Sequence, residues 1–158
     1  MKKKIGISSK CLDGKHILMM DFDLSEGENK KKLQAEIMVK IIDIIGKYGL
    51  PDFYVFETKH GFHVVCMAKM MLKTVLKAYN DFKPLADKHH IRIGGGVCKR
   101  FILRIGGEIK PVAVVSGSNF FLWATSKAHQ EFFSHFYDAP MRDQNPDESG
   151  IVVFELWE

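Results

Sequence analysis

Apolar and polar positions alternate between residues 17 and 105 in an order that predicts strand, helix, two strands, helix and strand. The first strand is 17–24, ILMMDFDL. In the next segment, 30–50, apolar residues recur at helical spacing until Gly49 and Pro51 end the pattern. A hairpin is predicted over 52–69 with KHG as its turn, then a second helix over 71–88 that Pro84 breaks or kinks, and glycine-separated strand pieces up to 105.

This β-α-β-β-α-β order predicts an α+β fold of the ferredoxin-like, or RRM-like, type. A C-terminal extension is predicted to add the strand PVAVVSG, a helix that Ser126 caps, a surface loop and a last strand IVVFELW. In such a fold the first strand lies in the middle of an antiparallel sheet, flanked by the third and fourth strands. Both helices cover one face, so we expect the other face to be open for binding or chemistry.

The composition predicts one domain over residues 1–158, because a chain of 158 residues with 46% hydrophobic residues buries one ordinary core. Since no apolar run of about 18 residues and no signal peptide is found, we expect a cytoplasmic, intracellular protein without a membrane partner. Cys11, Cys66 and Cys98 lack zinc-ligand spacing and are predicted to be buried thiols. The net charge of +4 is compatible with a polyanionic partner but does not establish one.

Strand alternation predicts which polar side chains lie on the open face of the sheet. If Leu18, Met20 and Phe22 point toward the helices, Met19, Asp21 and Asp23 point away from them. The same alternation turns His63 outward on the third strand, between Phe62 and Val64. On the fourth strand, with Phe101, Leu103 and Ile105 packed inward, Arg100 and Arg104 are predicted to face outward. Two acids, one imidazole and two guanidinium groups are therefore expected on one surface.

Two neighbouring carboxylates repel each other unless a cation lies between them. Carboxylate oxygens are preferred ligands of Mg²⁺ and Mn²⁺, usually together with substrate phosphates, and arginine binds phosphate through paired hydrogen bonds. The pattern therefore predicts metal-assisted phosphoryl or nucleotidyl transfer.

The segment DFD after an apolar strand, followed by FETKHGFHVV, resembles motifs I and II of the archaeo-eukaryotic primase (primase-polymerase) superfamily. The resemblance covers roughly residues 15–110. It implies an RRM-like minimal catalytic core in which Asp21 and Asp23 are catalytic and hold Mg²⁺ or Mn²⁺. It also implies that His63 acts in catalysis by binding the phosphates of the incoming nucleotide.

The resemblance further implies a nucleotide-binding role for the turn residues Thr58, Lys59 and His60, beside the two outward arginines, Arg100 and Arg104. The family has a third acidic metal ligand in a later strand, for which Glu108 is the candidate here; Gly106 and Gly107 precede it, and the alternative Asp87 is near the end of the second helix. The implied partners are a single-stranded DNA template, nucleoside triphosphates and a helicase or other replication protein.

A second interpretation is a non-catalytic RRM-like domain that binds single strands on the same face, or a decayed primase that serves as a replication subunit. An RRM carries aromatic residues on its first and third strands. Here those positions hold Asp21, Asp23 and His63, which favours the enzyme. Taken singly, each signal also has a structural explanation: a DxD pair can be solvated, a strand histidine can be a hydrogen-bonding residue, and Phe120, Phe121 and Trp123 are better explained by core packing than by base stacking.

Overall fold

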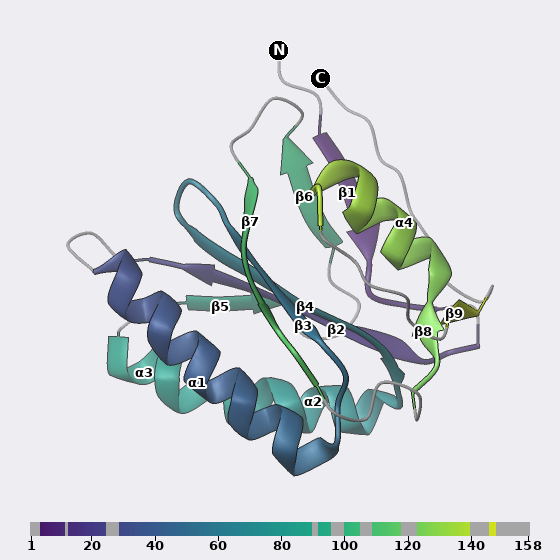
Figure 1. The fold of residues 1–158 in the computed structure, drawn as a ribbon, viewed down its shortest axis with the longest axis horizontal. Helices are drawn as coiled ribbons and strands as arrows, with labels where there is room; N and C mark the ends of the chain where they lie inside the picture. The colour runs from purple at the N-terminus through teal and green to yellow at the C-terminus, as the bar shows by residue number, and fades with distance from the viewer. Residues whose placement is uncertain are drawn as a thin grey trace.

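Strand β2 (His16–Asp23) is an interior strand of an antiparallel sheet and lies between β4 (Gly61–Met70) and β5 (Arg92–Gly95). The computed structural model describes residues 4–11, 13–24, 29–89, 92–95, 100–104, 109–117, 123–139 and 146–147, with the backbone alone for 4–6, 89, 92–95, 100–104 and 146–147. The sheet continues beyond β4 through β3 (Phe53–Glu57) to β7 (Lys110–Val115), giving the order β5-β2-β4-β3-β7 (Figure 1). The α+β class and the predicted hairpin are confirmed.

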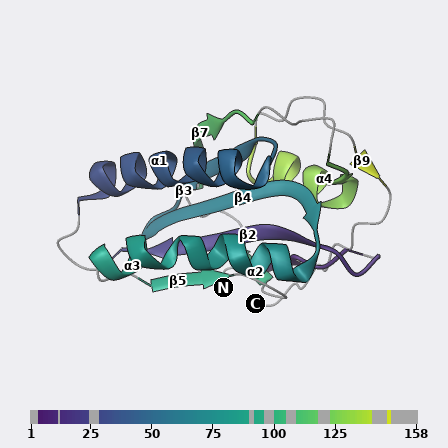
Figure 2. The ribbon, with the colours of Figure 1, turned by 90° about the horizontal axis from the view of Figure 1, so that it is seen from below.

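Helices α1 (Lys30–Tyr48), α2 (Leu72–Asp81) and α3 (Lys83–His89) cover one face of this sheet (Figure 2). The side chain of Asn29 accepts a hydrogen bond from the backbone N–H of Lys32 and so begins α1; Gly49 ends α1 in the left-handed conformation, as its position predicts. The predicted second helix is divided at Phe82, two residues before Pro84, because proline removes a backbone donor and crowds the preceding turn.

The core between these helices and the sheet contains the residues that alternation assigns to the helical side. It includes Leu18, Met20 and Phe22 from β2, as predicted, and Phe62, Val64 and Cys66 from β4. Cys11 and Cys66 are buried thiols, as expected, and burial raises the pKa of Cys66 to about 12. Cys98 lies outside the described residues.

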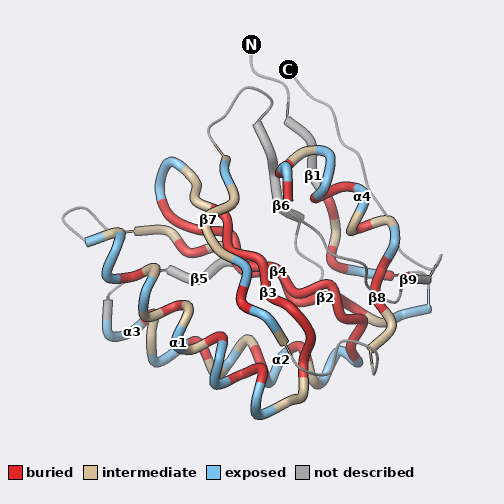
Figure 3. Tube along the Cα trace, in the orientation of Figure 1, coloured by how far each residue is buried: buried red, intermediate tan, exposed pale blue. Residues whose placement is uncertain are grey.

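The opposite face of the sheet carries a second core, which corrects the expectation of an open face. Helix α4 (Lys127–Phe136) packs on this side, together with strand β1 (Lys4–Ser8) (Figure 1). The buried residues of this core are Ile7, Cys11, Ile17, Met19, Tyr54, Phe56, Val65, Met67, Phe132, Phe133, Tyr137 and Ala139. Buried residues therefore run through the strands on both faces (Figure 3). The physical reason is that β2, β3 and β4 carry apolar side chains at outward positions too, and leaving these in water is unfavourable.

The predicted fourth strand is also corrected. The strand beside β2 is β5, in which Gly94 and Gly95 lie opposite Asp21 and Met20. Strand β6 (Arg100–Arg104) instead pairs with β1 in a separate two-stranded sheet. A strand has only two edges, and those of β2 are taken by β4 and β5.

The first strand and the helix of the predicted C-terminal extension are confirmed, whereas β9 lies within the predicted surface loop. Ser126 caps α4 by accepting a hydrogen bond from the N–H of His129, and the predicted strand near 111–117 is β7. The short strand β8 (Thr125–Ser126) pairs with β4 and, in parallel, with β9 (Pro146–Asp147). The last strand expected at IVVFELW lies outside the described residues, and so do Phe120 and Phe121.

Trp123 packs at the margin of the helical-side core and donates its indole N–H to the carbonyl of Gly49 at 2.6 Å, so its structural role is supported. Within the part of the chain that the structure describes, the helices are too short or too polar to cross a bilayer.

Candidate active site

Asp21 and His63 lie directly opposite each other on β2 and β4. Strand alternation predicts that they share a face, whereas their register is a finding of the structure. The distance between His63 Nε2 and Asp21 Oδ1 is 3.4 Å. The His63 side chain is 9% exposed, whereas that of Asp21 is 35% exposed. The pair therefore lies at the margin of the second core, with the imidazole inside and the carboxylate facing solvent.

The other ring nitrogen of His63 contacts a residue from the second core. Tyr137, which directly follows α4, lies with its hydroxyl 2.8 Å from His63 Nδ1. Burial raises the pKa of the Tyr137 hydroxyl well above its usual value, and the negative charge of Asp21 raises it further. A polar chain therefore runs from the buried Tyr137 through His63 to the partly exposed Asp21. No local pattern points to Tyr137 as a partner of His63, because 74 residues separate the two.

Asp23 follows Asp21 by two positions and is partly exposed on the same face, opposite Gly61. Beyond it, the N–H of Leu24 donates to the carbonyl of His60 at 2.8 Å, so the hairpin turn lies next to the end of β2. The structure thus brings the turn Thr58–His60 to the two aspartates. Lys59 and His60 are exposed, and Thr58 is partly buried.

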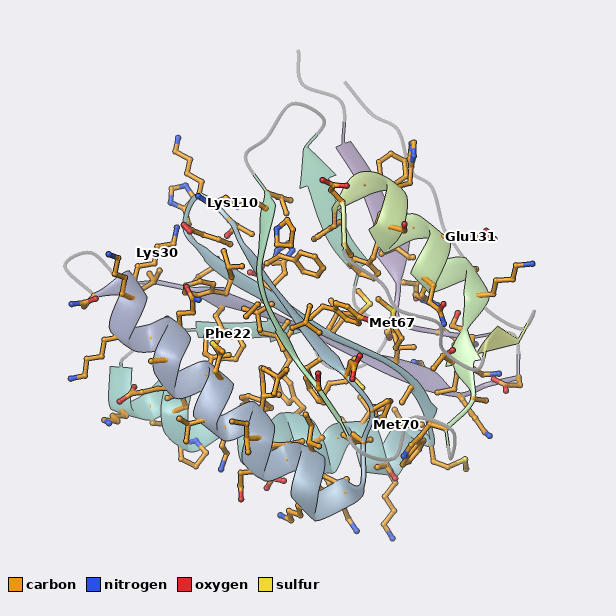
Figure 4. The ribbon with its side chains drawn as sticks, viewed as in Figure 1. Phe22, Lys30, Met67, Met70, Lys110 and Glu131 are labelled. Carbon is orange, nitrogen blue, oxygen red and sulfur yellow. The ribbon has the colours of Figure 1, made fainter. Side chains whose placement is uncertain are left out.

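Two further lysines lie at the base of this turn. Lys30 Nζ donates to the carbonyl of Thr58 at 2.7 Å and lies 3.6 Å from a carboxylate oxygen of Glu57. Lys110 on β7 is exposed and is the register partner of Glu57 on β3. Figure 4 shows Lys30 and Lys110 beside the hairpin. Together with the exposed Lys59 they place positive charge at the hairpin turn, which suits an anionic ligand. The sequence did not single out Lys30, because it is one of three consecutive lysines.

Of the remaining predicted site residues, the two arginines do not lie on a strand that pairs with β2, contrary to the prediction. Arg100 and Arg104 are the ends of β6 and pair with Ser8 and Lys4 of β1, not with β2. The prediction that these two arginines lie on the strand beside Asp21 is therefore wrong, because that strand is β5 and not β6. Glu108, the candidate third metal ligand, lies outside the described residues.

The chemistry of Asp21 and Asp23 fits a hard divalent cation. Magnesium usually binds proteins through one or two carboxylates and takes its other ligands from water and substrate phosphates. Two partly exposed carboxylates on one face of β2 meet that requirement. No cluster of three histidine, cysteine or acidic side chains suited to a metal occurs among the described residues. Among the described residues, these two carboxylates would be the ligands of such a site.

A groove of about 600 Å³ lies elsewhere, between α1 and α3. Its apolar lining includes Val39, Pro84 and Leu85. Because α1 covers the helical face of the sheet, this groove lies on the side away from His63, and none of the predicted site residues lines it.

Comparisons of the chain with known protein families, with curated proteins and with solved structures found no match.

Proposed function

We propose that this protein is a metal-dependent nucleotidyltransferase of the primase-polymerase type. One observation carries the proposal: Asp21 lies opposite His63, 3.4 Å away, at the end of the sheet where Asp23 and the turn Thr58–His60 also lie. Carboxylates for a metal ion and cationic or hydrogen-bonding groups for phosphates thus occupy one surface.

The order of elements supports the same proposal. From β2 to β5 the chain runs β-α-β-β-α-β, with α2 and α3 forming the second helical segment, and β2 pairs with both β4 and β5. We assign this part of the chain to the ferredoxin-like, RRM-like arrangement. In such a core the catalytic groups project from the central strands, where packing on both sides holds the backbone fixed.

Each residue has a distinct role in the proposed reaction. Asp21 and Asp23 would hold Mg²⁺ or Mn²⁺, which when bound would neutralise phosphate charge and orient the reacting oxygens. His63 would donate from Nε2 to a phosphate oxygen of the nucleoside triphosphate, while the turn residues Lys59 and His60 would bind the remaining phosphate charge. The present 3.4 Å separation from Asp21 is long for a hydrogen bond, so a phosphate oxygen can replace that contact.

The proposed reaction joins a nucleotide to a strand paired with a single-stranded DNA template. The 3′-hydroxyl oxygen of that strand bonds to the α-phosphorus, and its proton is lost to solvent. The bond between the α-phosphorus and the bridging oxygen to the β-phosphate breaks, and pyrophosphate leaves. A helicase or another replication protein is the proposed macromolecular partner.

A primer-synthesis and primer-extension assay on single-stranded DNA, with Mg²⁺ or Mn²⁺, tests this function. We expect Asp21→Asn and Asp23→Asn each to lower the rate on the order of 100-fold, because each removes charge that the reaction requires. Asp43→Asn is the matched control, since Asp43 is exposed on α1, and should leave the rate unchanged. If the wild type makes no product but binds single strands equally well with and without the aspartates, the protein is a non-catalytic single-strand-binding domain.

A further inference from the structure

We propose that Tyr137 is a positioning residue for His63: its hydroxyl donates to Nδ1 and holds the imidazole in the tautomer that carries its proton on Nε2. That proton then faces Asp21 and the proposed phosphate site. The effect on nucleotide binding rests on the proposed function; the effect on the imidazole does not.

The two contacts of His63 use different nitrogens. Nδ1 lies 2.8 Å from the Tyr137 hydroxyl oxygen, and Nε2 lies 3.4 Å from Asp21 Oδ1. A neutral imidazole carries one donor and one acceptor nitrogen. An ionised carboxylate only accepts hydrogen bonds, so the nitrogen that faces Asp21 is the donor. Nδ1 is then the acceptor, and Tyr137 supplies the proton of that hydrogen bond.

Tyr137 is suited to be the donor because its environment keeps the hydroxyl protonated. The residue is 1% exposed, and the Asp21 carboxylate nearby opposes a second negative charge. A phenolate could only accept a hydrogen bond and would require a proton on Nδ1. Burial and charge therefore act together to fix the direction of this hydrogen bond.

The Tyr137 ring is itself fixed by aromatic neighbours. Its centroid lies 4.8 Å from those of both Phe56 and Phe133, in edge-to-face geometry. Its backbone N–H donates to the carbonyl of Phe133 at 3.0 Å, which closes the last turn of α4. The helix that covers the second face of the sheet therefore also delivers a hydroxyl to a fixed point beside His63.

This arrangement matters for an anionic ligand. Without the Tyr137 hydroxyl, Nδ1 loses that donor, and the long 3.4 Å contact of Nε2 with Asp21 holds the tautomer less firmly, so a larger fraction of neutral His63 would carry its proton on Nδ1. In the wrong tautomer the Nε2 lone pair would face the carboxylate and the incoming phosphate, and both contacts would be repulsive. Tyr137 thus prepares His63 before the substrate arrives, which lowers the cost of binding.

The direct test is long-range proton–nitrogen NMR of the histidine rings at mildly alkaline pH, where an ordinary imidazole is neutral. The His63 signals are assigned from their loss in His63→Gln. We expect the wild type to show a neutral ring protonated on Nε2. Tyr137→Phe keeps the aromatic ring and removes only the hydroxyl, and should give a mixture of both tautomers. A wild-type ring protonated on Nδ1, or on both nitrogens, overturns the proposal even if the variant does not fold.

Phe132→Leu is the control, because it loosens the same core without removing a hydroxyl. It should lower stability and leave the His63 tautomer unchanged. If it shifts the tautomer as much as Tyr137→Phe does, the hydroxyl has no specific role and the proposal fails.

Kinetics separate this proposal from the proposed function. In an active enzyme, Tyr137→Phe should raise the KM for the nucleotide about fivefold, as expected for one lost hydrogen bond, with a smaller change in kcat. An active wild type whose tautomer is unaffected by Tyr137→Phe refutes the positioning role alone. An inactive wild type that shows the expected tautomer shift refutes the nucleotidyl-transfer function and leaves the positioning role standing.

Discussion

Gly61 of β4 contacts the backbone of Phe22 on β2 so closely that a Cβ atom at Gly61 would overlap the carbonyl group of Phe22. Gly61 is also the register partner of Asp23. Gly61→Ala must therefore push β4 away from the strand that carries both aspartates. We expect the free energy of unfolding to fall by about 3 kcal/mol, measured by urea denaturation.

Gly46→Ala is the matched control for that prediction. Gly46 lies in α1, and a Cβ atom there would have no neighbour within 4 Å. Because alanine has the higher helix propensity, this variant should gain up to about 1 kcal/mol. Equal effects of the two substitutions would contradict the close approach at Gly61.

Stability should fall in mild acid because of His129, which is fully buried in α4. Its Nε2 lies 2.6 Å from the carbonyl oxygen of Ser8, and its Nδ1 lies 2.5 Å from the Ser126 hydroxyl. Burial lowers the pKa of His129 from 6.5 to about 4. The unfolded chain therefore binds a proton below about pH 6.5 that the folded chain does not, so stability is complete above that pH and decreases toward pH 4.

Because of this effect, the measured free energy of unfolding should fall by about 2 kcal/mol between about pH 7 and about pH 5. His129→Gln, which does not titrate, should flatten the pH dependence but not abolish it, because burial also lowers the pKa of His16. His135→Gln, at an exposed position of the same helix, should keep the wild-type pH dependence. An unchanged pH dependence in His129→Gln would refute this assignment.

Lys69 is the most buried charged partner in the ion pairs described: its side chain is 1% exposed, and Nζ lies 2.5 Å from Asp13 Oδ2. The hydrogen bond from Lys69 lowers the pKa of the Asp13 carboxyl. Asp13→Asn leaves the buried ammonium beside a neutral group. We expect a loss of about 2 kcal/mol in urea denaturation, less than for a fully buried pair because Asp13 is 36% exposed.

The pair Lys40–Asp43 provides the comparison, since Asp43 is 65% exposed and the atoms are 3.5 Å apart. Asp43→Asn should change stability by less than about 0.5 kcal/mol. Lys69→Met should be tolerated better than Asp13→Asn, because it removes the buried charge instead of leaving it beside a neutral side chain. The reverse order would show that the ion pair does not determine stability at this position.

Lys30 should support nucleotide binding through the turn that it holds. Its Nζ donates to the carbonyl of Thr58 and lies 5.8 Å from the centre of the Phe62 ring. Lys30→Met keeps an apolar stem over Phe62 but loses that hydrogen bond, and should weaken nucleotide binding about fivefold in a titration. Lys32→Met, on the exposed side of α1, should bind as the wild type does; equal affinity in both variants would remove Lys30 from the site.

Local sequence determined much of the main sheet and its helical cover. Alternation along β2 separated Phe22 from Asp21 because successive side chains of a strand point to opposite faces. Helical periodicity, with Gly49 as a stop signal, located α1, and the short turn after Glu57 located the hairpin. These features depend on neighbours within a few residues, so they can be deduced from the printed sequence. The facing of Asp21 and His63 followed once the two strands were taken as adjacent.

Only the tertiary structure decided what lies against the second face and which strand completes the sheet. Met19, Val65 and Met67 are buried on that face, but nothing local identified α4 as its cover or Tyr137 as the partner of His63. The pairing of β5 instead of β6 with β2 likewise depends on competition between distant segments for one strand edge. Such contacts are selected by the packing of the whole chain, whereas alternation and helical spacing act within each segment.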